Sequence, residues 1–300
     1  MEESRCPESL RMMKRLIAGT KRAFGLHRPG RNLLVFPDDT FLASYPKSGN
    51  TWTRFLIANL AFPNSSPDWG NIDRLIPGPE VMSKRDLARM VRPRILRTHD
   101  CFDPRYKRVI YVVRDPRDVA ISQYHHHRKR RVMDDDFPFE NFIRRFLAGE
   151  TCEHGSWKEN AGSWLAARSG DPAFLLLRYE DLLVDTAAEL SKAASFLGIA
   201  ATAQQIAHAV ERSSASQMRE LERAKSDQCA LTKDTRQDLP FVRTARSGNW
   251  KTEMPVACVA AIEAAWGPLL QWLGYELASV PDAVARTQEF PFSLLEGAAK

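Results

Sequence analysis

The sequence has no long apolar run and only five cysteines, and both features exclude classes of protein. A membrane-spanning helix needs about 18 or more consecutive apolar residues, and the 300 residues contain no such run. The cysteines are scattered without a CxxC pair, which excludes a zinc-finger pattern and a dense disulfide framework. The N-terminal residues also lack the continuous apolar segment of a secretory signal. We therefore expect a cytoplasmic protein with free thiols.

The charge balance is positive without being extreme, because 43 Lys and Arg residues oppose 37 Asp and Glu residues, for a net charge of +6. This excess suits an anionic ligand, a phosphorylated cofactor or an anionic membrane surface. It is too diffuse to indicate a nucleic-acid partner, and none is predicted. The apolar content of 44% and charged content of 27% are those of an ordinary globular protein.

Residues 1–37 differ from the rest of the chain, because apolar and basic residues recur there at roughly helical spacing. A basic amphipathic helix over residues 10–26 would make a peripheral membrane contact. The same pattern is typical of a surface helix whose apolar side packs on the body of the protein. We favour this second interpretation, since short apolar stripes usually face a core.

Four short apolar segments predict buried strands, and amphipathic segments between them predict helices. Strands that are apolar throughout and alternate with helices indicate an α/β protein, whose central parallel sheet is flanked by helices in three layers. Residues 223–249 are polar and weakly periodic, which predicts a long functional loop. The expected strands are 40–45, 94–99, 108–114 and 174–179, and the expected helices are 51–60, 116 onward, 137–148, 156–168, one after 179, 203–222 and 254–273.

The sharpest local feature is the turn between the strand at 40–45 and the helix that follows it. Ligands of open parallel sheets bind at the carboxyl ends of strands, where backbone N–H groups of a helix N-terminus form a nest for an oxyanion. Lys47 would add a positive charge to the nest, and Gly49 would allow the anion to approach closely. On spacing alone an ordinary strand-to-helix turn is nearly as good an interpretation. The remaining donors would come from Ser48, Asn50 and Thr51.

A second candidate anion site follows the strand at 108–114. Arg114 ends that strand, and Asp115 and Pro116 fit the N-cap and first residue of a helix. An arginine can bind a phosphate bidentately, and Ser122 can donate a further bond from the helix. Taken alone, Arg114 is equally a strand-end cation and Ser122 a neutral helix residue.

Together the two motifs resemble those of the cytosolic-type sulfotransferases that use 3′-phosphoadenosine 5′-phosphosulfate (PAPS). The string YPKSGNTW, from Tyr45 to Trp52, resembles the loop that binds the 5′-phosphosulfate, and Arg114 with Ser122 resembles the motif for the 3′-phosphate. The resemblance covers residues 38–275 and implies a sulfotransferase domain with a P-loop-like fold. Residues 1–37 and 276–300 are then an N-terminal segment and a C-terminal tail.

The resemblance also implies roles by position. His99 corresponds to the general base, Lys47 to the cation at the departing phosphate, and Arg97 to a cation near the sulfuryl group. PAPS is then the sulfuryl donor and PAP, its desulfated form, the product, with no metal. The acceptor is a small molecule, a lipid or a glycan with a hydroxyl or amine. The residues implied to contact the nucleotide are Trp52 and Tyr179 at the adenine, Ser213 and Met218 beside it, and Arg243 at the 3′-phosphate.

Two departures from the family pattern stand out near the C-terminus. Thr244 and Ala245 replace the usual Lys and Gly, so one cationic contact is missing or comes from Arg246. Pro255 and Ala260 replace the Thr and Glu of a short dimer motif. The family's dimer is therefore not carried over, and the oligomeric state stays open.

Two other functions are alternatives to this interpretation, and two polar runs could suggest metal sites. A P-loop kinase or nucleotide hydrolase would place its Lys after the Gly pair, whereas here the Lys precedes the Gly. A non-catalytic protein that binds nucleotides or a membrane surface is the other alternative. The run His125–Arg131 predicts a solvated or anion-attracting helix end rather than a metal site, because consecutive helix residues point in different directions. Asp134–Asp136 predicts a cap for the next helix.

Overall fold

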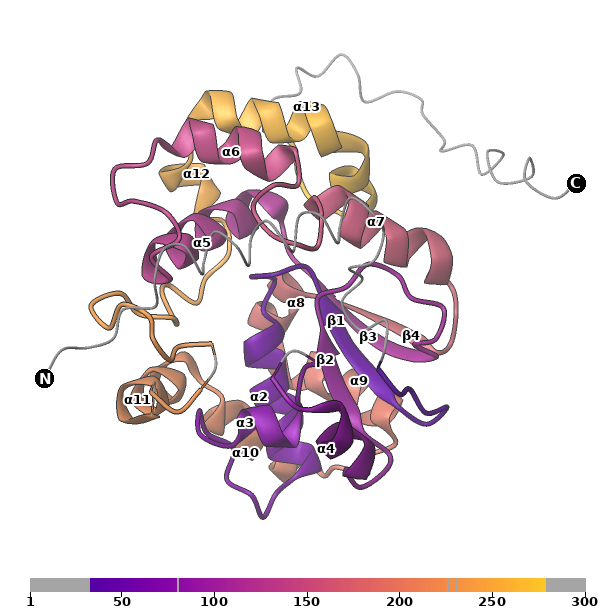
Figure 1. Cartoon of the computed structure of the whole chain (residues 1–300). Helices are drawn as coiled ribbons and strands as arrows, with labels where there is room; N and C mark the ends of the chain where they lie inside the picture. Colours follow the sequence, from indigo (N-terminus) through magenta and orange to yellow (C-terminus); the bar gives the residue numbers. More distant parts are fainter. Residues whose placement is uncertain (1–32, 80, 226, 230, 279–300) are drawn as a thin grey trace, which may run out of the picture.

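The computed structural model describes residues 33–278, apart from residues 80, 226 and 230. The predicted helix over residues 10–26 and the tail beyond residue 278 lie outside the described residues. Four parallel strands form a sheet in the order β2-β1-β3-β4, with helices on both faces (Figure 1). The predicted three-layer α/β fold is therefore confirmed. The strands are β1 (Thr40–Ser44), β2 (Ile95–Thr98), β3 (Arg108–Val113) and β4 (Phe174–Arg178).

The helices form two layers and a few short connections. One face of the sheet carries α5 (Pro116–Lys129), α6 (Phe139–Leu147), α7 (Trp157–Arg168) and α13 (Val256–Trp272). The other face carries α2 (Asn50–Ala61), α9 (Thr186–Leu197) and α10 (Ala203–Arg212). The remaining helices are α3 (Ile72–Leu75), α4 (Lys84–Arg89), α8 (Tyr179–Val184), α11 (Ala215–Lys225) and α12 (Trp250–Glu253).

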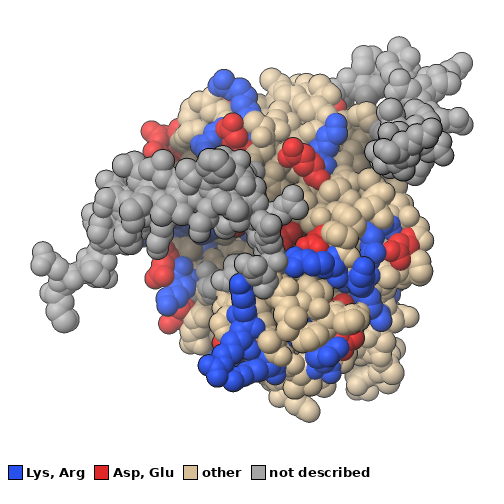
Figure 2. All heavy atoms as spheres, turned by 45° about the vertical axis from the view of Figure 1, so that its right-hand side comes forward, with Lys and Arg blue, Asp and Glu red and all other residues tan. Residues whose placement is uncertain are grey.

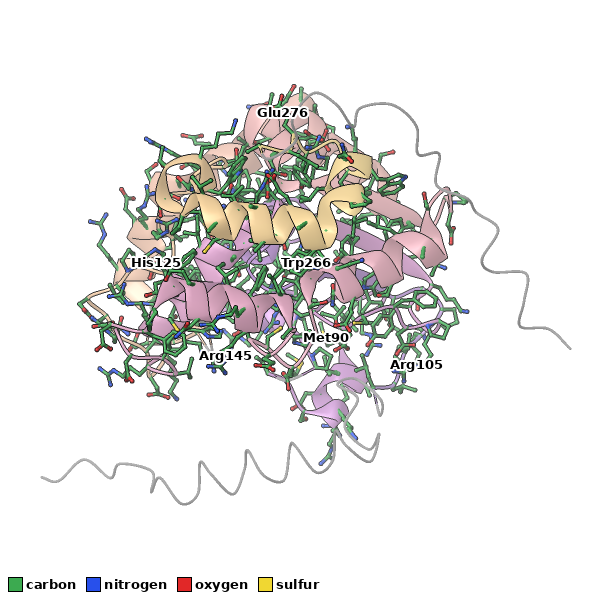
Figure 3. All side chains as sticks on the ribbon, turned by 90° about the horizontal axis from the view of Figure 1, so that it is seen from above. Met90, Arg105, His125, Arg145, Trp266 and Glu276 are labelled. Carbon is green, nitrogen blue, oxygen red and sulfur yellow. The ribbon has the colours of Figure 1, made fainter. Side chains whose placement is uncertain are left out.

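Alternate side chains of each strand enter two different apolar cores. Phe41 and Tyr111 face the core beneath α5 and α13, whereas Leu42 and Ile110 face the core beneath α2. All four are fully buried, which explains why the strands are apolar throughout rather than in alternation. Trp266 of α13, labelled in Figure 3, belongs to the first of these cores.

Some helices that periodicity predicts as continuous are divided in the structure. The predicted helix over 203–222 ends at Arg212 and restarts at Ala215, giving α10 and α11. The helix after Tyr179 is likewise divided at Asp185, whose side chain accepts the N–H of Ala188 and caps α9. Breaks of one or two residues leave the apolar spacing almost unchanged, so the pattern does not reveal them.

The α11–α12 segment, residues 226–249, has no helix or strand in its described part, as predicted. The buried Lys129, at the end of α5, donates from Nζ to the carbonyls of Arg236 at 2.8 Å and Leu239 at 2.5 Å. Glu222 of α11 lies 3.7 Å from Lys129 and accepts the N–H of Phe241 at 2.6 Å. A buried ion pair therefore fixes the α11–α12 segment across the end of α5.

The prediction of a solvated or anion-attracting end for α5 agrees with the exposure of Arg130 and Arg131 but not with the burial of Lys129. Lys129 is buried, and the ring of His126 packs edge-on against Phe241 with ring centroids 5.7 Å apart. The α11–α12 segment covers this end of the helix. The sequence around α5 does not indicate this contact, because the covering residues lie far along the chain. Across the described residues, no three His, Cys, Asp or Glu side chains are grouped to hold a metal ion.

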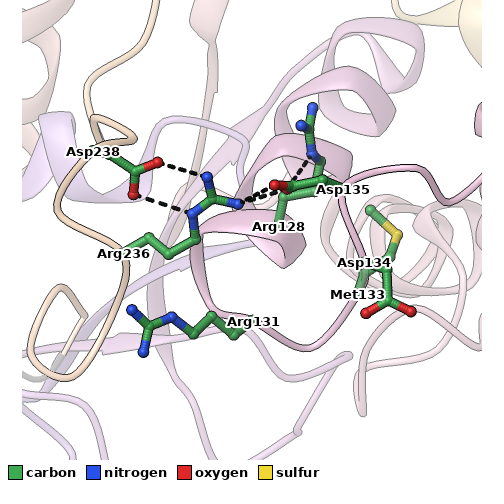
Figure 4. A pocket seen from close by; sticks show the side chains of 7 residues that line it. All are labelled: Arg128, Arg131, Met133, Asp134, Asp135, Arg236 and Asp238. Atoms are coloured by element: carbon green, nitrogen blue, oxygen red, sulfur yellow. Dashed lines mark hydrogen bonds and ion pairs between the residues drawn. The ribbon is translucent and has the colours of Figure 1, made fainter.

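The prediction that Asp134–Asp136 caps α6 is wrong. The N-cap of α6 is Pro138, with no side-chain cap. Asp135 instead accepts hydrogen bonds from Arg128 and Arg236 in a charged surface pocket (Figure 4). Arg236 is 101 residues further along the chain, so the acidic run serves a distant partner rather than the adjacent helix.

Acidic and basic side chains are interspersed over much of the face shown in Figure 2. This agrees with the diffuse positive excess of the sequence. Among residues 33–278 with the stated gaps, no helix is both long and apolar enough to cross a membrane.

Candidate active site

The turn after β1 adopts an unusual backbone conformation. Lys47 has a φ of 70° and Gly49 a φ of 101°, both in the left-handed region. A Cβ at Gly49 would lie 2.5 Å from Cδ2 of Tyr179, so this position requires glycine. Beside it, the buried Ser48 Oγ has no hydrogen-bond partner among the described residues. Strain and an unpartnered buried hydroxyl are typical of a turn that binds a ligand.

Helix α2 begins directly at this turn, so its first backbone N–H groups point into the turn without intrahelical acceptors. The side chain of Asn50 points back to the sheet, where Nδ2 donates to the Leu42 carbonyl and to Ser44 Oγ, each at 3.2 Å. Asn50 therefore contributes its backbone N–H to the nest, while its side chain fixes α2 to β1. Thr51 is partly buried in the same first turn.

Arg114, directly after β3, reaches this same turn. Its Nη1 donates to the Lys47 carbonyl at 3.3 Å, and its Nη2 donates to the Arg246 carbonyl at 3.0 Å. The guanidinium also lies over the ring of Tyr179, 4.2 Å from its centroid. The two anion motifs are thus neighbours in space, because β1 and β3 are adjacent strands.

Aromatic side chains line one side of the turn. The rings of Trp52 and Tyr179 meet edge to face, with centroids 5.7 Å apart. Trp52 Nε1 donates to the Ser213 carbonyl at 2.9 Å, which joins the α10–α11 break to the start of α2. Ser213 Oγ accepts a hydrogen bond from Asn59, and Met218 is buried in the core beneath α2. The structure therefore brings Trp52, Tyr179 and Ser213 together, whereas Met218 serves packing.

The other side of the turn faces the α11–α12 segment. Ser122 is partly buried on α5, eight residues after Arg114. Arg243 donates from Nη1 to Glu253 Oε2 at 2.8 Å. Of the predicted 3′-phosphate contacts, Arg114 contacts the turn directly, whereas Arg243 is paired with Glu253.

Asp118 is a positioning residue that the sequence did not single out. Its carboxylate accepts the backbone N–H of Gly248 at 2.6 Å and of Trp250 at 3.0 Å. These bonds hold the end of the α11–α12 segment, including the Arg246 carbonyl, against Arg114. An acidic residue in the first turn of a helix is ordinarily explained by its interaction with the helix dipole, so the sequence alone does not indicate this further role.

His99 follows β2 and is oriented by the end of β1. Its Nδ1 lies 2.8 Å from the Ser44 carbonyl oxygen, so Nδ1 carries the proton and Nε2 is the proton acceptor. Burial, and then the charge of the buried Arg97, lower the pKa of His99 well below its usual range. A neutral imidazole in this orientation can accept a proton from a ligand.

Lys47 rests on an aromatic ring of the α11–α12 segment. Its Nζ lies 4.1 Å from the ring centroid of Phe241, a residue without a predicted role. Burial, and then the charge of Arg114, lower the pKa of Lys47 to about 7. A cation with so little solvation gains stability when an anion binds beside it.

Comparison with known proteins identifies the family. The family model described as "Sulfotransferase domain" matches residues 37–274. The chain belongs to the sulfotransferase family. Sulfotransferase 1A1 of Bos taurus is 29% identical over 245 residues, covering 76% of this chain and 82% of the relative. The 3-beta-hydroxysteroid sulfotransferase of Cavia porcellus is 31% identical, covering 75% and 80% of the two chains.

Solved structures share the fold of this sulfotransferase. Retinol dehydratase in a complex with retinol and PAP has a TM-score of 0.68 at 22% identity, covering 80% of this chain and 83% of the other. Mouse sulfotransferase SULT7A1 complexed with PAP has a TM-score of 0.65 at 27% identity, covering 80% and 86%. The family match favours sulfuryl transfer over the kinase, hydrolase and non-catalytic alternatives.

The sulfotransferase carries backbone strain at Ala245, whose φ is 53°. We expect Ala245→Gly to raise the free energy of unfolding by about 0.5–1 kcal/mol, because glycine adopts this conformation without the Cβ penalty. Urea denaturation measures the change. Ala261→Gly, at an exposed site within α13, is the matched control and should destabilise by about 1 kcal/mol. Equal destabilisation by both substitutions would contradict the assignment of strain to Ala245.

Proposed function

We propose that this sulfotransferase binds PAPS between Arg114 and the turn after β1 (Lys47–Asn50, the Lys47 turn). We also propose that His99 is its general base. The observation that carries the proposal is the hydrogen bond from Arg114 to the Lys47 carbonyl. Two cationic sites therefore meet at one sheet edge, which supports a single ligand with two anionic ends. Two proteins of the same fold are described as PAP complexes, which supports the same ligand here.

The residues at the turn fit a nucleotide with two anionic ends. Ser48 Oγ, which no described residue contacts by a hydrogen bond, and the N–H groups at the start of α2 suit a phosphosulfate. Arg114 and Ser122 suit a 3′-phosphate, with Arg243 as a further cation once it leaves Glu253. The adenine would lie against Trp52 and Tyr179, with Ser213 beside Trp52, while Met218 supports this side from the core beneath α2.

The chemistry follows from where the side chains hold charge and protons. PAPS supplies an activated sulfuryl group. His99 removes the proton from the acceptor hydroxyl or amine through Nε2 while the acceptor atom attacks sulfur in line. Lys47, Thr51 and the N–H groups of α2 stabilise the negative charge that grows as the bond from sulfur to the 5′-phosphate breaks. Arg97 supplies positive charge on the sulfuryl side, and PAP is the product.

The acceptor is a small molecule, a lipid or a glycan with a nucleophilic hydroxyl or amine. Retinol dehydratase is described in complexes with retinol and with androsterone, which makes apolar alcohols the first class to test. A cytoplasmic location with peripheral membrane contact through residues 10–26 stays a prediction. Loss of liposome binding on deletion of residues 1–30 would support the contact, and no liposome binding by the full chain would contradict it.

Binding and transfer are tested separately. We expect PAP to raise the melting temperature of the full chain by several degrees, whereas ATP with magnesium has little effect. Radiolabelled PAPS is then incubated with a panel of phenols, apolar alcohols, amines, steroids and sugars, and labelled products are counted. Transfer to at least one acceptor class is expected. Stabilisation by ATP with magnesium and not by PAP would contradict the proposal.

The pKa of Lys47 predicts how PAP affinity depends on pH. Lys47 in the ligand-free site has a pKa of about 7, and a neighbouring phosphate favours its charged form. PAP binding above pH 7 therefore takes up a proton, and affinity should fall by up to about tenfold per pH unit until the pKa in the complex is reached. The second pKa of a phosphate is about 6, so the phosphates are nearly fully ionised in this range and contribute little slope.

Calorimetric titration of PAP from pH 7 to about pH 9 measures this slope. Lys47→Met removes the titrating group, so its affinity should be lower and nearly independent of pH. Parallel pH profiles for the variant and the unmodified protein would assign the proton to another group.

A further inference from the structure

A second imidazole lies beside His99. The rings of His99 and His154 have centroids 5.7 Å apart and planes inclined by 62°. Two imidazoles this close can exchange a proton through one bridging water when a nitrogen of each faces the gap between them. His154 belongs to the segment between α6 and α7, to which neither the motifs nor the proposed mechanism assigns a role.

The segment that carries His154 is fixed to the carboxyl edge of the sheet. Tyr45, directly after β1, donates from its hydroxyl to the Gly155 carbonyl at 3.3 Å. The Cys101 thiol lies 3.6 Å from the His154 carbonyl oxygen, and a capping box at Ser156 sets the start of α7. The position of His154 relative to His99 is therefore set by rigid elements on both sides.

Each nitrogen of His154 lies near a carboxylate oxygen but beyond hydrogen-bond distance from it. Nδ1 lies 3.6 Å from Asp100 Oδ1, and Nε2 lies 3.8 Å from Glu153 Oε1. Asp100 is mostly buried and accepts a hydrogen bond from Tyr106 through its other oxygen, whereas the Glu153 side chain is 60% exposed. His154 thus connects the interior of the site to a carboxylate at the surface.

The low pKa of His99 disfavours keeping a proton there. Burial is the largest cause of its low pKa, followed by the charges of Arg97 and His154, and Arg54 adds to them. The hydrogen bond to the Ser44 carbonyl acts in the opposite sense. A proton left on Nε2 after sulfuryl transfer would serve as the general acid for the reverse reaction. The forward reaction therefore benefits from a group that removes it.

We propose that His154 is the proton exit of the site, receiving the acceptor's proton from His99 and releasing it to solvent beside Glu153. This inference rests on the proposed function, in which His99 takes that proton. The acceptor O–H bond breaks as the proton moves to Nε2 of His99, while the new O–S bond forms and the bond from sulfur to the 5′-phosphate breaks. His99 then gives the proton to His154 and returns to its neutral form with Nδ1 protonated. His154 acts only through His99 and touches no reacting atom.

The test is a double-mutant cycle with kcat measured in dilute buffer. His154→Asn keeps a donor for Asp100 but cannot carry a proton, and it should lower kcat about tenfold. Added imidazole should restore most of the loss by carrying the proton instead. In the His99→Asn background, His154→Asn should have no further effect on kcat, because no proton then reaches His154 through this relay from His99 to His154. His208→Asn, at an exposed site on α10, is the control, with kcat and its imidazole response unchanged.

The outcomes separate the relay from the proposed function. An unchanged kcat in His154→Asn overturns the relay, as does a loss that imidazole does not restore and that adds to the loss in His99→Asn. Such an additive loss would assign His154 to packing or acceptor contact. If His99→Asn itself keeps the kcat of the unmodified protein, or if no acceptor is sulfated, the proposed function fails and the relay with it.

Discussion

Replacing His99 with asparagine is expected to lower kcat by about 10²–10⁴-fold, with PAP affinity unchanged within about twofold. The asparagine amide can still donate to the Ser44 carbonyl, which accepts from Nδ1 at 2.8 Å in the structure. It cannot take a proton where Nε2 stands. The substitution therefore removes the base while preserving its nearest structural contact. Transfer from radiolabelled PAPS gives kcat, and calorimetry gives the affinity for PAP.

The control for this substitution is His208→Asn, since His208 is exposed on α10, away from the turn. Its kcat should equal that of the unmodified protein. If His99→Asn retained full kcat, the base would be another group. A fall in melting temperature that accounts for the lost activity would point instead to a structural role for His99.

Gly49→Ala is expected to lower kcat/KM by about a hundredfold or more, because it displaces the turn that positions the nucleotide. The backbone φ of 101° disfavours any residue with a Cβ, and the new methyl group would lie 2.5 Å from Tyr179 Cδ2. Tyr179 cannot move aside cheaply, because its ring is packed between Trp52 and the guanidinium of Arg114. We also expect the free energy of unfolding to fall by about 2–4 kcal/mol.

Gly162→Ala provides the matched control. Gly162 lies within α7, and a Cβ there meets no atom within 4 Å. This substitution should stabilise the protein by about 1 kcal/mol and leave activity unchanged. Urea denaturation and steady-state kinetics measure both effects. Normal kcat/KM in Gly49→Ala would show that the turn does not hold the nucleotide.

The parts of the site that could be predicted from sequence are those encoded within a few residues. The strand that ends before Pro46, the turn from Lys47 to Asn50 and the helix start form one continuous signal. The cap at Asp115, whose side chain accepts the N–H of Arg117, is equally local. The strand order that makes Lys47 and Arg114 neighbours is not local, since it depends on β1 pairing with β3.

The parts that could not be predicted depend on partners far along the chain. Lys129 reads as a solvated cation among other basic residues, yet it is buried because Glu222 and the carbonyl of Arg236 satisfy its ammonium. Asp118 is buried for the same reason, with the N–H groups of Gly248 and Trp250 as its partners. Whether a charged side chain is buried depends on the partner that it meets in the folded protein. The sequence around one member of the pair therefore does not predict its burial.

The central claim is that the Lys47 turn and Arg114 hold opposite ends of one nucleotide. The most direct measurement compares the affinities for PAP and for adenosine 5′-phosphate, which lacks the 3′-phosphate, in the unmodified protein and in Arg114→Ala. A general disruption of the site lowers the affinity for both ligands alike. The ratio of the two affinities therefore reports only the contact with the 3′-phosphate. We expect the unmodified protein to prefer PAP by about a hundredfold and Arg114→Ala by about tenfold or less. A preference for PAP in Arg114→Ala as large as in the unmodified protein would contradict the claim.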